Sequence, residues 1–327
     1  TIEGERLGAE ATDQPRLRIG LFTTMRHADI SLLLWGLLLV APIYLITAFR
    51  WWMLLRERDI HVPLWRAFSL CMVGCFFNYC MPGSTGGDLV KAFYAAKGTP
   101  NRRADAVMTV IIDRIVGLLG LVLLAGVAGL FIQDNRRAEK VTLFIWAFAG
   151  AIVLVSAFYF SKRIRKASGL GFVLTKLLPR EGLLSKIDQA ASAYSNHKMT
   201  VAISILLSLP VHILLAVSAA MAGYALGMKT PLGTMMTVIP VLFLVAAVPI
   251  SYQGFGLMEY FAIKLLVWPE AMPLATANQI VVMLVLIRLF QVFYSLAGSV
   301  FLLRGDIHMH PEKDEAGQPP PVTQAAG

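Results

Sequence analysis

Six charged residues stand inside or beside long apolar stretches of the sequence. They are three cations and three carboxylates: Arg114, Lys264 and Arg288, with Asp88, Asp113 and Glu259. A charge near the centre of a bilayer costs about 2.5–3.5 kcal/mol on insertion scales, so such residues are usually paired or functional. Guanidinium groups bind phosphate through two parallel hydrogen bonds. These residue types therefore suit a site for an anionic headgroup, or alternatively buried ion pairs, Arg114–Asp88 and Arg288–Glu259, that fix helix packing.

The composition indicates that these charges belong to a membrane protein. Of the 327 residues, 57% are apolar and 15% are charged, whereas soluble domains have about 45–50% apolar and about 25% charged residues. A secreted disulfide scaffold is excluded by the 3 cysteines, and a soluble enzyme is close to excluded. The net charge of +9 indicates basic loops beside anionic lipid rather than a nucleic-acid partner.

Five apolar segments are long enough to cross a bilayer, which takes about 20 residues in a helix. They are residues 30–49, 105–132, 141–161, 199–228 and 271–303. The first ends on Arg50-Trp51-Trp52, which we interpret as an aromatic and basic anchor at the membrane interface. The sequence therefore predicts an all-α polytopic membrane protein with five full spans.

Two further apolar segments contain residues that break helices. Segment 67–87 ends in a cluster of Pro and Gly at 82–87, and segment 230–258 is interrupted by Pro240, Pro249 and the glycines at 254 and 256. Lipid cannot satisfy the freed backbone N–H and C=O groups, so such segments belong inside protein or beside a water-filled cavity. We predict two re-entrant or broken helical hairpins.

The basic residues predict an orientation. The amphipathic linker 162–198 holds eight Lys and Arg residues and should be cytoplasmic. Loops 50–66 and 88–104 and the tail 304–327, which is disordered by composition, then also lie in the cytoplasm. Segment 1–29 lies on the opposite, extracytoplasmic side. An N-terminus on that side predicts a further membrane helix upstream of the first residue.

In this orientation the membrane domain 30–303 divides into two halves of opposite direction, about 30–132 and 141–303. Each half has a span, a broken segment and a second span. The breaks share a Pro-x-Ser sequence with a Gly two or three residues later, followed by an acid and then by an intramembrane arginine: Pro82, Ser84, Gly86, Asp88 and Arg114 in one half, and Pro249, Ser251, Gly254, Glu259 and Arg288 in the other. Inverted repeats with interrupted helices are typical of transporters, whose site lies near the midplane. The alternative is chance similarity.

Other polar residues carry weaker signals. For His212, a hydrogen bond to a neighbouring helix is favoured over a proton relay. Cys71 and Cys75 share a helix face, but no third ligand completes a metal site, so we interpret them as reduced apolar residues. The sequence contains no nucleotide-binding loop and no His-Glu-x-x-His motif. We therefore predict no cofactor and no enzymatic activity.

Three motifs resemble a known family. Segments 78–91 (NYCMPGSTGGDLVK), 113–118 (DRIVGL) and 249–259 (PISYQGFGLME) are similar to the flippase-like family related to the membrane half of bacterial lysylphosphatidylglycerol synthase. The resemblance covers about 30–303. Family members place a basic residue, usually Arg, after the first break, where this chain has Lys91. The resemblance implies movement of a lipid between leaflets and one more N-terminal helix, but not the aminoacyl transfer of the synthase's soluble domain.

The resulting hypothesis is a multi-pass flippase or transporter of the cell membrane that moves an anionic or aminoacylated lipid through a central polar cavity. The candidate headgroup site comprises Ser84, Gly86, Gly87, Asp88, Lys91, Asp113, Arg114, Ser251, Tyr252, Gly254, Glu259 and Arg288. Its partner would be a membrane phospholipid or a polyprenyl-phosphate lipid. A second copy of the chain and a lipid-modifying enzyme are further partners to consider.

Two other function classes stay open at this stage. The first is a membrane-embedded enzyme acting on a lipid-linked substrate, with its general base among Asp88, Asp113, Glu259 and His212. The second is a membrane subunit for a cytoplasmic enzyme docked on the basic linker 162–198. The sequence does not show whether the carboxylates converge.

Overall fold

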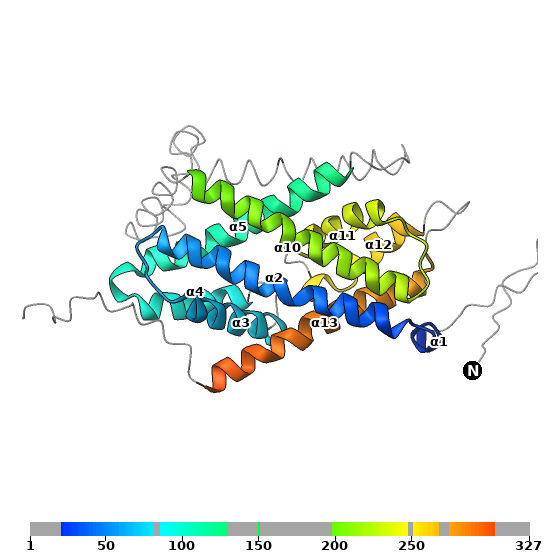
Figure 1. Ribbon diagram of the computed structural model, residues 1–327, viewed down its shortest axis with the longest axis horizontal. Coiled ribbons are helices and arrows are strands. Elements are labelled where there is room, and N and C mark those ends of the chain that lie inside the picture. The colour runs from blue at the N-terminus through cyan, green and yellow to red at the C-terminus, as the bar shows by residue number, and fades with distance from the viewer. Residues whose placement is uncertain are drawn as a thin grey trace, which may run out of the picture.

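The computed structural model describes residues 21–81, 86–129, 150, 198–247, 251–267 and 275–304. The regular elements within these ranges are all helical, which confirms the predicted all-α class for the described residues. In chain order (Figure 1) they are α1 (Leu21–Arg26), α2 (Ile30–Arg56), α3 (Leu64–Cys80), α4 (Gly86–Gly98), η1 (Pro100–Arg102), α5 (Arg103–Gly129), α10 (Lys198–Ala225), α11 (Leu232–Ala247), η2 (Tyr252–Gly254), α12 (Leu257–Leu266) and α13 (Ala277–Leu303).

Four helical stretches in the described part are long and apolar enough to cross a membrane: α2, η1 with α5, α10, and α13. They correspond to four of the five predicted spans. The fifth, 141–161, lies outside the described residues, as do most of the linker 162–198, almost all of the tail 304–327 and residues 1–20. Helices α3 and α11 have 17 and 16 residues, and α4 and α12 have 13 and 10. Each is shorter than the roughly 20 residues that a span needs.

Helix ends follow local sequence signals. The Asp29 carboxylate caps α2 by accepting a hydrogen bond from the Ser31 backbone N–H at 2.8 Å. The chain reverses after α2 at Asp59, which has a positive φ of 51°. Helix α2 ends at Arg56 rather than near residue 49, and α4 and η1 occupy 86–102. The predicted loops 50–66 and 88–104 are therefore largely helical, which corrects their assignment as connections.

The second break is a turn in left-handed backbone. Gln253, Gly254 and Gly256 have φ values of 51°, 71° and 81°, a region that glycine enters without the steric penalty of a Cβ. The Glu259 carboxylate accepts a hydrogen bond from the Gly256 N–H at 2.8 Å, where α12 begins. The predicted interruption of segment 230–258 is therefore present between α11 and α12.

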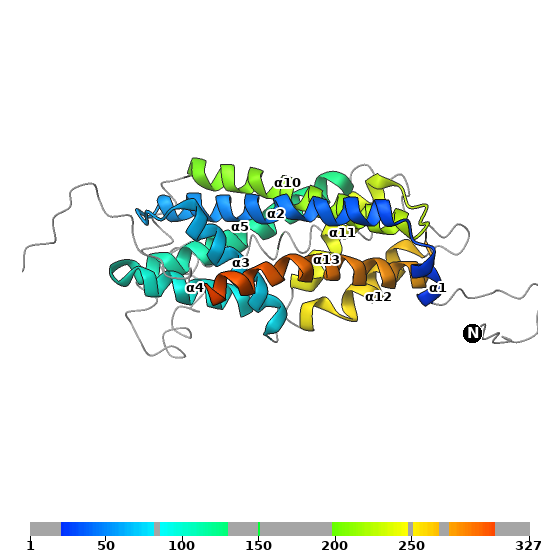
Figure 2. The same ribbon diagram turned by 60° about the horizontal axis from the view of Figure 1, so that its bottom comes forward.

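The two halves pack with the same pattern of neighbours. Helices α2 and α10 lie side by side and run in opposite directions (Figure 1). Among the described helices, α3 contacts α4 of its own half and α13 of the other half. In the same way, α11 contacts α12 of its own half and α5 of the other half. Helix α4 packs on α5 as α12 packs on α13. Figure 2 shows α2 and α10 in one layer, with α13, α3, α4 and α12 in another.

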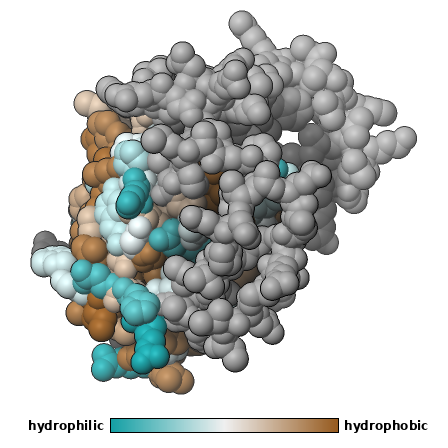
Figure 3. All heavy atoms as spheres, turned by 90° about the vertical axis from the view of Figure 1, so that its right-hand side faces the viewer, coloured by the Kyte–Doolittle hydropathy of each residue, from teal (hydrophilic) through white to brown (hydrophobic). Residues whose placement is uncertain are grey.

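Each half has its own apolar core. One surrounds Trp51 and Leu70, between α2, α3, α4 and α5, and the other surrounds Leu242 and Ile280, between α10, α11, α12 and α13. Phe301 of α13 joins the first core and Val40 of α2 joins the second, so the two cores also hold the halves together. Outward-facing side chains such as Leu38 and Phe293 are also apolar, as lipid requires. Figure 3 shows this hydrophobic flank beside hydrophilic residues at the end of the bundle where α1 lies. Between helices in lipid, close packing rather than a hydrophobic force holds the fold together.

Candidate functional site

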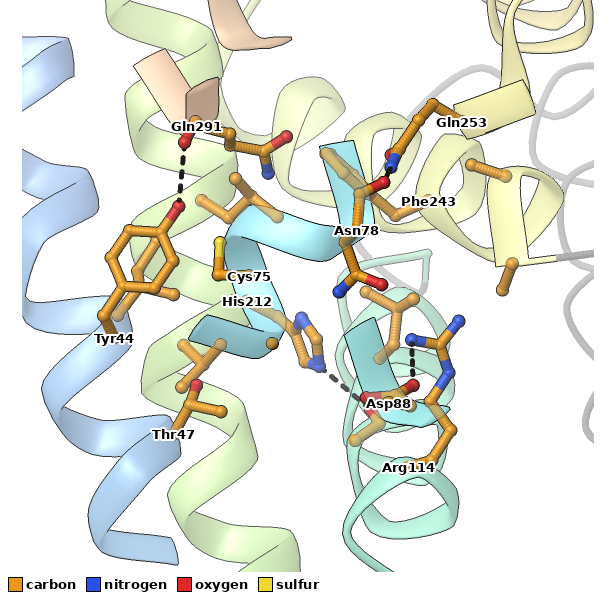
Figure 4. Close-up of a pocket in the computed structure, with 18 of the residues that line it drawn as sticks. Tyr44, Thr47, Cys75, Asn78, Asp88, Arg114, His212, Phe243, Gln253 and Gln291 are labelled. Atoms are coloured by element: carbon orange, nitrogen blue, oxygen red, sulfur yellow. Dashed lines mark hydrogen bonds and ion pairs between the residues drawn. The ribbon is translucent and has the colours of Figure 1, made fainter. Parts of the chain in front are cut away.

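A cavity of about 370 Å³ lies between the two halves (Figure 4). It is lined by residues of α2, α3, α4 and α5 from one half, and of α10, α11, η2, α12 and α13 from the other. Five of the predicted site residues line it: Asp88, Lys91, Asp113, Arg114 and Arg288. The structure therefore brings the charges beside both breaks to one central space.

Asp113 is the centre of a buried charge cluster. Arg50 Nε donates to Asp113 Oδ1 at 2.8 Å, and Lys91 Nζ donates to Asp113 Oδ2 at 3.1 Å. Arg50 Nη1 also donates to Ser208 Oγ at 2.6 Å. Lys91 Nζ lies 4.0 Å from the ring centre of Trp51, within the range of a cation–π interaction. Asp113 thus connects α2, α4 and α5, and Arg50 extends the cluster to Ser208 on α10.

Arg50 and Trp51 are buried within the protein, which contradicts the prediction that they form an anchor at the membrane interface. Their exposed fractions are 5% and 0%, and Trp51 Nε1 donates to Thr109 Oγ1 at 3.0 Å. The physical reason is that α2 continues past Arg50, so that the arginine faces the cavity and Asp113 stabilises its charge. The apolar run 51–55, which continues the apolar segment beyond Arg50, was the available signal in the sequence.

Each half has an ion pair between its broken segment and its next long helix. Arg114 Nη1 on α5 lies 3.3 Å from Asp88 Oδ2 on α4, and both side chains are about one-third exposed. Arg288 on α13 pairs with Glu259 on α12, and its guanidinium carbon lies 3.9 Å from the ring centre of Phe255. Both ion pairs anticipated as the structural alternative therefore form, and their partners occupy corresponding helices.

The ends of the two broken segments touch. Tyr252 Oη donates to the Tyr79 carbonyl oxygen at 2.5 Å, and Gln253 Nε2 donates to the Asn78 carbonyl oxygen at 2.6 Å. The Gly87 N–H in turn donates to Asn78 Oδ1 at 2.8 Å. Asn78 and Gln253 also line the cavity. Both lie in the motif segments 78–91 and 249–259, but an uncharged amide gives no separate signal in the sequence.

The remaining residues of the predicted site do not line the cavity in the described structure. Ser84 lies outside the described residues. Residues 86, 87, 251, 252, 254 and 259 are not among those that line the cavity, although Glu259 holds Arg288 there. Lys264 is exposed on α12, 5.8 Å from the ring centre of Tyr260. Lys264 therefore does not join the cations that line the cavity.

His212 and two cysteines also line the cavity. His212 Nε2 lies 2.9 Å from the Gly117 carbonyl oxygen on α5, which is the interhelical hydrogen bond favoured from the sequence. Cys71 and Cys75 are partly buried and free. In the described part of the chain, no group of three His, Cys, Asp or Glu residues is arranged to hold a metal ion.

Comparison with known proteins shows the family. The sequence model of the family described as "Lysylphosphatidylglycerol synthase TM region" matches residues 20–298. The chain belongs to this family. With its four apolar spanning helices, this member of the lysylphosphatidylglycerol synthase TM-region family is a multi-pass membrane protein. The family match includes every helix up to the last turns of α13 and all the cavity residues.

One relative of this family member is a UPF0104 membrane protein of Pyrococcus horikoshii. The two are 29% identical over 169 residues. The aligned region is 50% of this chain and 50% of the relative, so the match spans about half the length of each. No solved structure is significantly similar to the chain.

Proposed function

We propose that this protein is a lipid flippase or transporter of the cell membrane that moves an anionic or aminoacylated lipid between leaflets. The charge of the central cavity carries the proposal. In the described part, four cations line it, Arg50, Lys91, Arg114 and Arg288, against three carboxylates, of which Asp88 and Asp113 line it and Glu259 pairs with Arg288. An uncompensated charge within a bilayer is costly. A bound phosphodiester, which carries one negative charge, would balance it.

The ion pairs suggest how a phosphate would be held. Arg114 is the most accessible of the cavity's paired arginines, so its guanidinium is free to turn from Asp88 to a phosphate. Arginine is suited to this exchange because its planar fork binds carboxylate and phosphate in the same geometry. Asp113 would hold Arg50 and Lys91 in place throughout. The three carboxylates that were candidate bases, Asp88, Asp113 and Glu259, are each ion-paired with a cation, and this favours transport over an enzyme with a carboxylate base.

The proposal includes an inverted repeat with two re-entrant hairpins. The matching helix neighbours of the two halves, the antiparallel α2 and α10, and the corresponding ion pairs support it. So does the contact between the ends of the broken segments at Tyr252 and Tyr79. Transporters of this architecture expose a central site to each side in turn, as one half moves against the other.

The topology predicts that the bases of the two hairpins lie on opposite sides of the membrane. In a chain with Cys71, Cys75 and Cys80 replaced by serine, His61→Cys should react with a membrane-impermeant maleimide only from the cytoplasm. Lys229→Cys should react only from the outside. Both native side chains are exposed, so labelling requires no unfolding. Labelling of both positions from the same side would contradict the inverted arrangement.

Removal of the cavity arginines should slow lipid movement. In proteoliposomes with fluorescent phosphatidylglycerol, we expect Arg114→Ala and Arg288→Ala each to reduce the rate by about tenfold or more. A hydrogen bond to a charged group contributes about 1.5–3 kcal/mol, and about 1.4 kcal/mol corresponds to a factor of ten. Dithionite quenching measures the rate. Arg102→Ala is the matched control, because its partner Asp59 is 72% exposed and neither residue lines the cavity. Wild-type rates in both cavity variants would exclude the assigned site.

A further inference from the structure

Two buried polar atoms of cavity-lining residues have neither a hydrogen-bond partner nor an ion-pair partner in the described structure. They are His212 Nδ1, on α10, and Arg288 Nε, on α13. Buried polar groups are almost always hydrogen-bonded, so each such atom calls for a physical explanation. The guanidinium Nε of Arg288 always carries hydrogen and needs an acceptor. Of the cavity's other polar groups, Asp88 Oδ2 also has no hydrogen bond, but it is ion-paired with Arg114.

The hydrogen-bonding role of His212 Nδ1 follows from the partner of the other ring nitrogen. His212 Nε2 lies 2.9 Å from the Gly117 carbonyl oxygen, which can only accept, so Nε2 carries hydrogen. A neutral imidazole with hydrogen on Nε2 has a lone pair on Nδ1. His212 in this form is an acceptor that lacks a donor. Figure 4 shows its ring among the residues that line the cavity.

The cation cluster lies directly beside this imidazole. A Cβ added to Gly117 would be 3.5 Å from Arg50 Nη2, so Arg50 lies close to the residue of α5 whose carbonyl oxygen His212 contacts. None of the cations there can satisfy Nδ1 in the present arrangement, because Arg50 donates to Asp113 and Ser208 instead. The cavity thus presents donors for a phosphate on several sides and, at His212 Nδ1, a buried acceptor that lacks a donor.

On the basis of the proposed lipid transport, we propose that His212 determines headgroup specificity. Its Nδ1 would accept a hydrogen bond from a hydroxyl or amine group on the headgroup, while Arg114 and Arg288 Nε donate to the phosphate. The substrate class is then a phosphodiester lipid whose headgroup carries a hydrogen-bond donor. The cavity of about 370 Å³ is near the lower limit of ligand pockets, about 300–1,000 Å³. Such a volume suits a headgroup alone, with the acyl chains in the surrounding lipid.

Two lipids of equal charge test this assignment. Phosphatidylglycerol has two hydroxyl donors, and phosphatidylmethanol has none. In proteoliposomes of the full chain that contain both as fluorescent analogues, the wild-type protein should move phosphatidylglycerol roughly 2- to 10-fold faster. That factor corresponds to one hydrogen bond of ordinary net strength. The ratio of the two rates is independent of the amount of folded protein, because both lipids use the same vesicles.

Two variants of His212 distinguish the roles of its two ring nitrogens. His212→Gln retains an N–H donor toward the Gly117 carbonyl but removes the acceptor at Nδ1, so the rate ratio should fall to about 1. His212→Asn places an amide oxygen near the position of Nδ1 and loses the donor to Gly117, so it should retain most of the preference. A ratio of 1 in the wild-type protein, or an unchanged ratio in His212→Gln, would overturn the role of His212 while leaving lipid transport intact. Movement of neither lipid by the wild-type protein would overturn the proposed function itself.

Discussion

Replacement of Asp113 by alanine is expected to lower the free energy of unfolding by about 3–5 kcal/mol, the range for removing one partner of a buried ion pair. The carboxylate is shared by Arg50 and Lys91, with N–O distances of 2.8 and 3.1 Å. All three side chains are less than 10% exposed. The alanine variant would leave two cations buried together, with repulsion between them added to the loss of both hydrogen bonds.

Two controls make the Asp113 prediction specific. Arg102→Ala removes the partner of Asp59 in an ion pair whose side chains are 45% and 72% exposed, and it should cost less than about 1 kcal/mol. Lys91→Met should also be tolerated better than Asp113→Ala, because it leaves Arg50 and Asp113 as a neutral pair. Denaturant or thermal unfolding in one detergent measures all three variants. If Asp113→Ala unfolds within 1 kcal/mol of the wild type, the charge cluster does not stabilise the fold as described.

Gly87→Ala is expected to have the second large effect, a loss of more than about 2 kcal/mol through steric overlap. An added Cβ would lie 1.8 Å from the Gly74 carbonyl oxygen and 2.7 Å from Asn78 Cγ. Both atoms belong to α3, and the first is backbone, so no rotamer change relieves the contact. Helix α4 would have to move away from α3, and Asp88 and Lys91 would move with it. Lipid movement should therefore decrease along with stability.

Gly233→Ala is the matched control for this substitution. Gly233 is the second residue of α11 as Gly87 is the second residue of α4. An added Cβ there has no neighbour within 4 Å. Alanine is the better helix former by about 1 kcal/mol in a helix interior, so this variant should be as stable as the wild type or slightly more so. Equal stability of the two alanine variants in the same detergent would contradict the close packing of α3 and α4.

Much of the site could be predicted because charged residues and helix breakers are unfavourable in a bilayer and are therefore easily recognised in an apolar segment. Asp113, Arg114 and Arg288 stand in otherwise apolar segments, and a charge in such a place needs a partner or a function. Helix breakers likewise mark the two interruptions, because lipid cannot satisfy free backbone groups. The four described spanning helices followed from length and apolar content alone.

Arg50 and His212 show what the sequence could not reveal. Whether an arginine near the end of an apolar segment lies at the interface or in the interior depends on where Asp113 of another helix is located, a contact across 63 residues. Whether the Nδ1 atom of His212 is an acceptor depends on the Gly117 carbonyl of α5. Both contacts result from helix packing, which cannot be derived from the sequence of a single helix.

The sequence by itself determined that this is a helical membrane protein with charges concentrated at two interruptions, because transfer free energies and backbone hydrogen bonding act residue by residue. Tertiary structure decided which charges meet. It placed Lys91 and Arg50 on Asp113, left Lys264 on the outer surface, and brought Tyr252 to Tyr79. These pairings depend on how closely helices approach, and that approach is limited by side-chain volume at contacts such as Gly87 on Gly74. The cavity and its excess of positive charge exist only once those contacts have formed.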